Sequence, residues 1–225
     1  MNPLTQVYLY LLGLASGLAV LAISAYRRVT PLWLRWLLIA SGLLVIGRYA
    51  TLALFTSPDA PQRFWALRRC YFLSAIGPTL PSVFAVDQLL RHPGMSPKKL
   101  LGWFAPFLVG YGFIILCGDV TPAADPVVGW TLHLTTPWRV AAAVIQGVFV
   151  VGFIGICVLL MRKVPSRPIR IALLGLALGH GYLALDGLLL SFGAWYFRPF
   201  LYSEMVTLLA IWHAYETAWS LQQAS

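Results

Sequence analysis

Residues 140–161 read VAAAVIQGVFVVGFIGICVLLM, and this stretch decides the fold class. It has no charged side chain and is long enough to cross a bilayer, which takes about 20 mostly apolar residues. Six other stretches are also mostly apolar and long enough, although several of them contain charged residues. The sequence therefore predicts an all-α polytopic membrane bundle, a single domain over 1–225 with seven transmembrane helices at about 5–26, 33–56, 70–91, 100–117, 139–161, 170–192 and 200–221.

The composition agrees with this fold class. Of the 225 residues 60% are apolar and only 10% are charged, against about a quarter in a soluble domain. Disorder needs the opposite balance, so both disordered and soluble proteins are excluded. The net charge of +9 lies in short connections rather than on one basic face, which excludes nucleic-acid binding. The longest connection, 118–138, is predicted to be a proline-rich surface loop.

The basic residues predict the orientation, because cytoplasmic loops are enriched in Lys and Arg. Alternate connections carry ten and five of them, which places the N-terminus outside and the C-terminus in the cytoplasm of a bacterial inner (plasma) membrane. The ten are Arg27, Arg28, Arg35, Arg91, Lys98, Lys99, Arg162, Lys163, Arg167 and Arg170, and the five are Arg63, Arg68, Arg69, Arg139 and Arg198.

Three charged residues inside the predicted spans are candidate functional groups, since charges are costly in a membrane. At 1.5 Å per residue Arg48 lies roughly 22 Å and Asp186 roughly 24 Å above the cytoplasmic side, and Glu204 lies in the same outer third. We expect Arg48 to form an ion pair with Asp186 or Glu204. The alternatives for the cluster are a structural pair and a polar pocket that binds a small ligand or ion.

Two histidines lie near the middle of the sixth and seventh predicted spans. His180 and His213 could be hydrogen-bonded helix contacts, a proton relay, a pH switch or the axial ligands of a haem b. On the seventh span His213 and Glu204 are nine residues apart, which puts them on opposite faces of the helix. If Glu204 faces the bundle, we expect His213 to face lipid or another subunit.

Catalytic motifs are absent from the sequence. It has no His-Glu-x-x-His and no phosphate-binding loop, and its lysines, Lys98, Lys99 and Lys163, lie outside the predicted spans, which excludes a retinal Schiff base. We therefore expect no enzymatic activity and no metal site. Cys70 and Cys117 fall at the same predicted side, where they could be free thiols or form a disulfide.

Small residues at a spacing of four predict close helix contacts, because glycine lets two backbones approach. Gly13 and Gly17 form one such pair, and Gly175 and Gly179 form another. We interpret both pairs as contacts within the bundle first and as contacts between copies second.

The stretch from Arg63 to Phe72, RFWALRRCYF, with the following Gly77, Pro78 and Pro81, resembles the entry to the third span of a known family. The family is the seven-helix membrane sensor region that precedes the signalling domain in bacterial histidine kinases and diguanylate cyclases. Trp130 and His133 in the fourth connection are similar to its aromatic and histidine content. This chain ends at Ser225 without such a domain, so the resemblance implies the fold and a sensing or coupling role, not kinase or cyclase activity.

Two functional hypotheses follow. The first is a non-catalytic integral membrane protein that senses a ligand or couples to a partner, either another membrane protein or a second copy. The second is a structural or redox subunit of a larger respiratory or photosynthetic membrane complex, with or without haem at His180 and His213.

Overall fold

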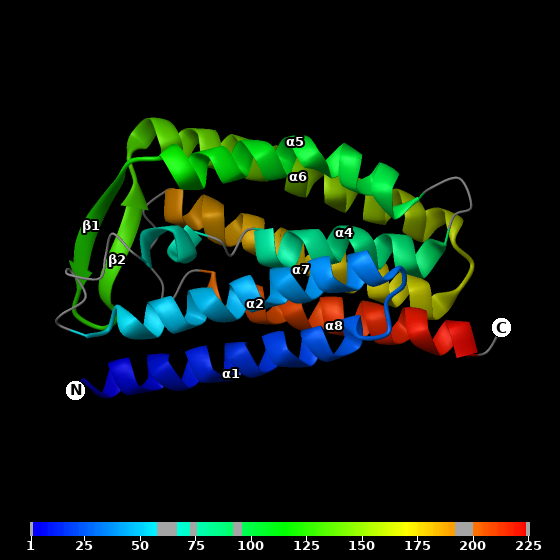
Figure 1. Ribbon diagram of the computed structural model, residues 1–225, viewed down its shortest axis with the longest axis horizontal. Helices are drawn as coiled ribbons and strands as arrows, with labels where there is room; N and C mark the ends of the chain where they lie inside the picture. Colours follow the sequence, from blue (N-terminus) through cyan, green and yellow to red (C-terminus); the bar gives the residue numbers. More distant parts are fainter. Residues whose placement is uncertain (1, 58–66, 73–75, 92–95, 192–199, 224–225) are drawn as a thin grey trace.

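The computed structural model describes residues 2–57, 67–72, 76–91, 96–191 and 200–223. Seven long helices run side by side, and one two-stranded sheet lies across an end of the bundle (Figure 1). The elements are α1 (Pro3–Tyr26), α2 (Leu32–Leu54), α4 (Ile76–Leu90), α5 (Pro97–Cys117), β1 (Val120–Asp125), β2 (Gly129–Leu134), α6 (Thr136–Lys163), α7 (Arg167–Ser191) and α8 (Leu201–Gln223). Residues 67–72 form a further short helical segment before α4.

Local sequence signals set several helix starts. The side chain of Asn2 accepts a hydrogen bond from the Leu4 backbone N–H (3.0 Å), and Pro3 is the first residue of α1. Ser96 caps α5 in the same way, accepting from the Lys99 N–H (3.3 Å) ahead of Pro97. An oxygen-bearing cap followed by proline is a favoured helix start, because proline has no N–H that would be left unpaired.

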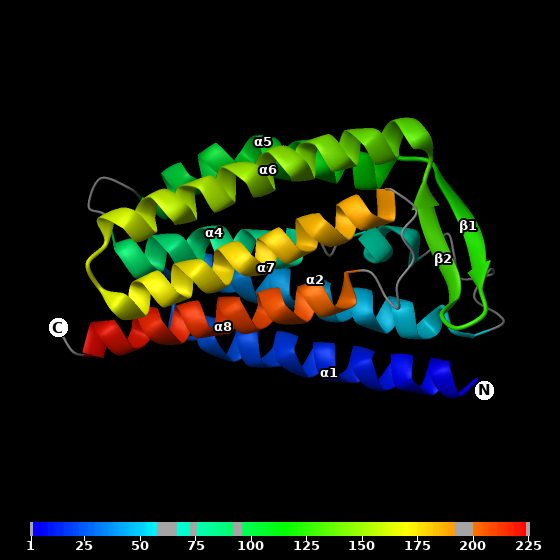
Figure 2. The same ribbon diagram turned by 180° about the vertical axis from the view of Figure 1, so that it is seen from behind.

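Successive helices run in opposite directions, so the two termini lie at opposite ends of the bundle (Figures 1 and 2). We call the end where α1 begins and β1 and β2 lie the hairpin end, and the other the far end. The ten basic residues counted together from the sequence all fall in or beside the connections α1–α2, α4–α5 and α6–α7. These connections lie at the far end.

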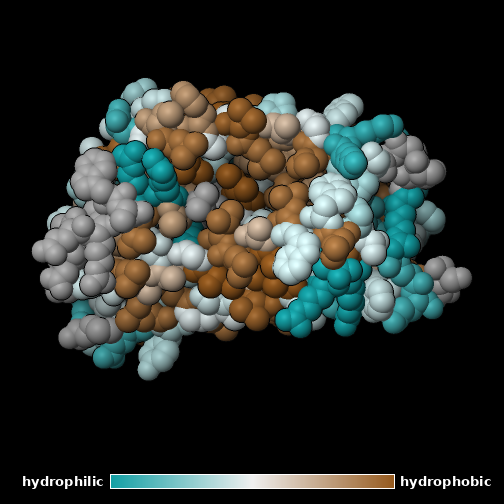
Figure 3. Space-filling view, viewed as in Figure 1, coloured by the Kyte–Doolittle hydropathy of each residue, from teal (hydrophilic) through white to brown (hydrophobic). Residues whose placement is uncertain are grey.

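Six helical stretches are long and apolar enough to cross a membrane, which gives the chain the character of a membrane protein. Apolar residues gather across the middle of the face in Figure 3, and most hydrophilic ones lie toward its two ends. The helix outside this set is α8, which lies alongside the others but carries Glu204, His213 and Glu216. The expected count of seven spans therefore depends on α8.

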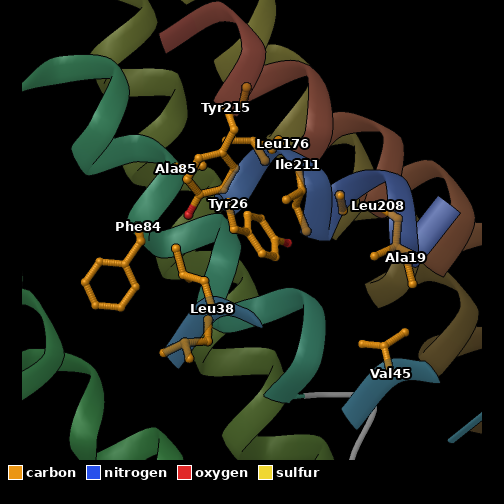
Figure 4. Packing of buried hydrophobic residues seen from close by; sticks show 14 of the residues in the cluster. Ala19, Tyr26, Leu38, Val45, Phe84, Ala85, Leu176, Leu208, Ile211 and Tyr215 are labelled. Carbon is orange, nitrogen blue, oxygen red and sulfur yellow. The ribbon is translucent and has the colours of Figure 1, made fainter. Parts of the chain in front are cut away.

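The core centres on α8, which packs against α1, α4 and α7. Tyr26 and Tyr215 meet there edge to face, with ring centroids 5.0 Å apart. The Tyr215 hydroxyl donates to the carbonyl of Pro81 (3.0 Å) inside α4. Figure 4 shows this packing, to which five helices contribute: Ala19 and Tyr26, Leu38 and Val45, Phe84 and Ala85, Leu176, and Leu208, Ile211 and Tyr215.

Residues 118–138, predicted to be a proline-rich surface loop, instead contain an antiparallel hairpin formed by β1 and β2 over Val120–Leu134. Asp125 Oδ1 closes its turn by accepting from the Val127 and Val128 N–H groups (2.8 and 2.9 Å). Gly129 has φ +79°, and an added Cβ would lie 2.2 Å from the Phe55 carbonyl oxygen. Only glycine fits both the left-handed backbone and this close approach.

The hairpin is attached to the first two helices as well as to its neighbours α5 and α6. The Thr5 hydroxyl donates to the Val127 carbonyl (2.7 Å), and the Trp130 N–H donates to the Phe55 carbonyl (3.0 Å). Phe55 and Leu132 are buried together, with Tyr71 packed on them. The hairpin therefore packs against the start of α1 and the end of α2.

The two glycine pairs behave differently. Gly179 faces α8, where an added Cβ would lie 2.9 Å from Thr207 Oγ1, so the expected contact within the bundle is confirmed for this pair. Gly13 and Gly17 have nothing within 4 Å of an added Cβ, so the same expectation was wrong for α1. All three cysteines are free thiols, and Cys70 and Cys117 form no disulfide.

The predicted span boundaries agree with the helices to within a few residues at most positions. The third differs, because the predicted span 70–91 corresponds to α4 at Ile76–Leu90 together with part of the segment 67–72. Arg63 and the residues up to Ala66 in the family-like stretch lie outside the described residues, as does Arg198.

Candidate functional site

The centre of the candidate site is a buried ion pair between Arg48 of α2 and Glu204 of α8. Arg48 Nη1 donates to both carboxylate oxygens of Glu204, at 2.7 and 2.6 Å. The two residues are 8% and 2% exposed, so the pair lies inside the bundle. The expected contact between Arg48 and one of the two carboxylates is thereby confirmed.

Further hydrogen bonds hold both partners in place. The Tyr49 hydroxyl donates to Glu204 Oε2 (3.0 Å), and Arg48 Nε donates to the Tyr71 carbonyl (3.1 Å). A buried ion pair offsets the loss of hydration only when its remaining donors and acceptors are bonded in this way. The pair is therefore a specified contact rather than a chance encounter of two long side chains.

The ion pair connects α2 and α8, two helices that share packing neighbours. Both α2 and α8 pack against α1 and α4, and the Arg48 side chain reaches across the interior to α8. Removing either charge would leave the other uncompensated in the low-dielectric interior, which is strongly unfavourable. The relative position of α2 and α8 at this level therefore depends on the pair.

Tyrosines surround the pair on several sides. Tyr8 of α1, Tyr71 and Tyr111 of α5 lie in the neighbourhood of the pair. The Tyr111 hydroxyl donates to the Phe72 carbonyl (3.3 Å). Tyr71 in turn lies in the cluster under the hairpin, so this polar centre is connected to the hairpin through packed side chains.

Asp186 does not join Arg48, although the sequence grouped the three charges. Its Oδ2 accepts from the Phe200 backbone N–H (2.9 Å) and from the Ser203 hydroxyl (2.5 Å). Asp186 is fully buried, and its Oδ1 has no hydrogen-bond partner in the described part of the chain. The predicted cluster is therefore two separate groups, the pair Arg48–Glu204 and the junction Asp186–Ser203.

The two histidines do not share an interior site. His180 is 1% exposed and lies against α6, with its ring centroid 4.6 Å from that of Phe153 and 5.8 Å from that of Phe149. Glu204 is buried and His213 is exposed, so the predicted helical phase is confirmed. A haem inside the bundle with both rings as axial ligands does not fit this arrangement.

Metal chemistry finds no support in the part of the chain that the structure describes. Within those residues no group of three or more His, Cys, Asp or Glu side chains could hold a metal ion. The His180 Nε2 is buried without a partner, but its neighbours at ring-contact distance are the apolar rings of Phe149 and Phe153.

A second ion pair lies at the far end and involves the same helix. Arg28, which follows α1, donates through Nη1 to Glu216 Oε2 of α8 (3.0 Å). The guanidinium carbon of Arg28 also lies 5.1 Å from the ring centroid of Trp219. These side chains are 47% and 33% exposed for Arg28 and Glu216, so this pair is accessible where the first is not.

Sequence reasoning missed the second pair and the tyrosines. Tyr49 could have been found, since it follows Arg48 directly and a phenol can donate to the carboxylate that the arginine attracts. The contact of Arg48 with the Tyr71 carbonyl had no sequence signal, because it depends on how the segment 67–72 packs.

Comparison with known proteins adds no family, as no protein-family model, curated protein or solved structure matches this chain.

Proposed function

We propose that this chain is a non-catalytic membrane protein that crosses the bilayer seven times and senses a ligand, or couples to a partner, through its helical bundle. The observation that carries the proposal is the buried pair Arg48–Glu204 at the hairpin end, hydrogen-bonded to Tyr49 and to the Tyr71 carbonyl. A charge pair of this kind inside a membrane bundle is costly and is by default a candidate functional group.

The helix α8 connects this pair to the opposite end. Glu204 and Glu216 are twelve residues apart, which is about 18 Å along the helix. Glu204 pairs with Arg48, whereas Glu216 pairs with Arg28. A ligand or partner that alters the first pair would favour a different position of α8, and that shift would change the contacts of Glu216.

The proposed topology places the hairpin outside and the C-terminus in the cytoplasm. It is supported by the ten basic residues at the far end and by the alternating direction of the helices. The polar helix α8 crosses with the others in this proposal because its charged Glu204 faces the interior instead of lipid. The resemblance to sensor regions agrees with this topology.

The sensing role is tested by perturbing the hairpin end and measuring the far end. Ser220→Cys, on an exposed position of α8, is introduced after the three native cysteines are replaced, and its reaction rate with a maleimide is measured in bilayer nanodiscs. We expect Arg48→Gln to change that rate on the order of fivefold or more, which is the range of ordinary coupling between sites.

Arg139→Gln is the matched control, because Arg139 is an exposed arginine at the hairpin end of α6. Glu204→Gln should reproduce the effect of Arg48→Gln, since both break one pair. Equal rates for Arg48→Gln and Arg139→Gln would contradict the coupling role. Equal rates together with a co-purifying membrane subunit would favour the second hypothesis, a component of a larger complex.

The topology is tested separately with compartment-specific reporters. One reporter is fused after Ser225, and another is inserted into the hairpin turn between Asp125 and Val128. We expect the first to be active only in the cytoplasm and the second only outside. If both reporters were active in the same compartment, the number of spans between the hairpin and Ser225 would be even. That result would contradict the proposal that α8 crosses the membrane and connects its two sides.

A further inference from the structure

The junction of α7 and α8 holds a buried carboxylate that is only half satisfied. Asp186 is fully buried, and both hydrogen bonds that it accepts go to Oδ2, from the Phe200 N–H and the Ser203 hydroxyl. Oδ1 has no partner within the described residues. A buried acceptor without a partner costs free energy, more so for a charged group, so this oxygen marks a place where a ligand would be stabilised.

The electrostatics of the junction favour a positive ligand. The helix α7 ends at Ser191, five residues after Asp186, and has no basic residue in its last turn. The C-terminal end of a helix carries partial negative charge and carbonyls without intrahelical donors, so a cation is favoured there. The ion pairs found among the described residues, Arg48–Glu204 and Arg28–Glu216, do not include Asp186.

The α8 side of the junction holds one of the two carboxylate oxygens. The Phe200 N–H that bonds Oδ2 belongs to the start of α8, where the helix end is positive. Asp186 thus caps α8 with one oxygen and leaves the other available. Neutral donors hold Oδ2 without compensating the charge.

Aromatic groups complete the surroundings. Tyr182 lies one turn before Asp186 on α7, and Tyr202 lies next to Ser203 on α8. The Phe200 ring lies 4.0 Å from the Cβ position of Gly187, and Phe200 has the unusual φ of 70°. A non-glycine residue in this conformation is held there by its surroundings, and such residues cluster at ligand sites.

We propose that the α7–α8 junction binds a small monovalent cation, with Asp186 Oδ1 as its anionic ligand. The shared chemistry is that of an alkali ion or a primary ammonium group. A single carboxylate suits one positive charge, and within the described residues no set of three acidic, His or Cys ligands exists for a divalent metal. This site is separate from Arg48–Glu204 and does not rest on the proposed sensing function.

The test measures thermal unfolding of the full chain in detergent that contains choline chloride as the only salt. NaCl, KCl or methylammonium chloride then replaces choline at constant ionic strength. We expect at least one of them to raise the midpoint of unfolding saturably, since a ligand that binds only the folded state stabilises it. The responding salt identifies the cation as an alkali ion or an ammonium group.

Asp186→Asn should abolish the saturable response, and Ser203→Ala should weaken it because it loosens the carboxylate. Asp119→Asn, on an exposed residue before β1, is the control and should respond as wild type does. No difference between choline and the other salts in the wild-type chain overturns the proposal, even where Asp186→Asn fails to fold. An unchanged response in folded Asp186→Asn also overturns it.

A further experiment tests Arg198, which lies outside the described residues. If this arginine were the cation that compensates Asp186, the wild-type chain would be insensitive to the salts and Arg198→Gln would become sensitive. That result overturns the proposal of a bound cation. A response in wild type that persists in Arg198→Gln supports it.

Discussion

The helices α6 and α8 have opposite relations to their surroundings. The helix α6 is the most apolar of the six membrane-crossing candidates, and only 11% of its most apolar stretch is buried within the bundle. The helix α8 is too polar to count among the membrane-crossing candidates, yet ten of its residues are buried. Hydrophobicity in this protein therefore marks the helix that the rest of the bundle covers least, whereas polarity marks the helix that other helices surround.

The physical reason is the absence of water as a competing solvent. Lipid tails solvate Leu and Val as well as a protein interior does, so apolar residues have no preference for the core. Polar groups such as Glu204 and Thr207 find partners only inside the bundle, and both are buried. Changes in the surroundings of α8 should therefore have larger effects than matched changes at more exposed positions.

The largest effect is expected where the surroundings of α8 are charged. Arg48→Ala leaves Glu204 buried without its partner, and breaking such a pair should lower the free energy of unfolding by about 3–5 kcal/mol. Arg139→Ala, on the exposed start of α6, should change it by less than about 0.5 kcal/mol. Reversible unfolding in mixed micelles measures both.

The neutral double variant Arg48→Met/Glu204→Leu separates charge from packing. It should be more stable than either single alanine variant, because no unpaired charge remains. Equal stability of Arg48→Ala and Arg139→Ala would contradict the inference that the surroundings of α8 are more sensitive to the loss of a charge than the exposed start of α6.

The second prediction compares a glycine that faces α8 with a glycine on the exposed side of α6. Gly179 of α7 faces α8, where an added methyl group would lie 3.0 Å from the Thr207 Cα, so Gly179→Ala should force the helices apart at a cost of about 1–3 kcal/mol. Gly152 of α6 has nothing within 4 Å of that position. Gly152→Ala should therefore be neutral or stabilising by up to about 1 kcal/mol through helix propensity.

The measurement is the same unfolding assay, with both variants in one background. A destabilisation by Gly152→Ala as large as that by Gly179→Ala would mean that α6 is packed against something beyond this chain. That result would sharpen the second functional hypothesis, in which a partner subunit covers α6.

The sequence predicted what the geometry of a single helix determines better than how the helices pack against one another. The spans of α1 and α6 followed from run length, and the shared level of Arg48 and Glu204 followed from the helical rise. The opposite faces of Glu204 and His213 followed from helical phase within one helix. Each of these inferences needs only the geometry of a single element.

The rest depended on how separate elements pack. Asp186 lies at a similar predicted level but faces Ser203 and Phe200, and nothing in one sequence specifies that direction. The hairpin was missed because Pro122 and the two alanines that follow it do not alternate as a typical strand does. Its stability comes instead from contacts with Thr5 and Phe55, which are remote in sequence.

The smallest effect is expected at the far end of α8 itself, where the same residue type is accessible. Glu216→Gln removes the contact with Arg28, but these side chains are 33% and 47% exposed and can be hydrated when separated. Pairs of this kind contribute less than about 1 kcal/mol, and salt screens them. We therefore expect Glu216→Gln to lower stability slightly at low ionic strength and to match wild type at about 1 M salt, where the screening length falls to roughly 3 Å.

Glu204→Gln should remain strongly destabilised at both salt concentrations, since its buried partner cannot be screened. If Glu216→Gln lowered the free energy of unfolding by several kcal/mol at both salt concentrations, the far end of α8 would be covered in the assembled protein. The two ends of α8 would then be equally buried, and the difference in burial would separate α8 as a whole from α6.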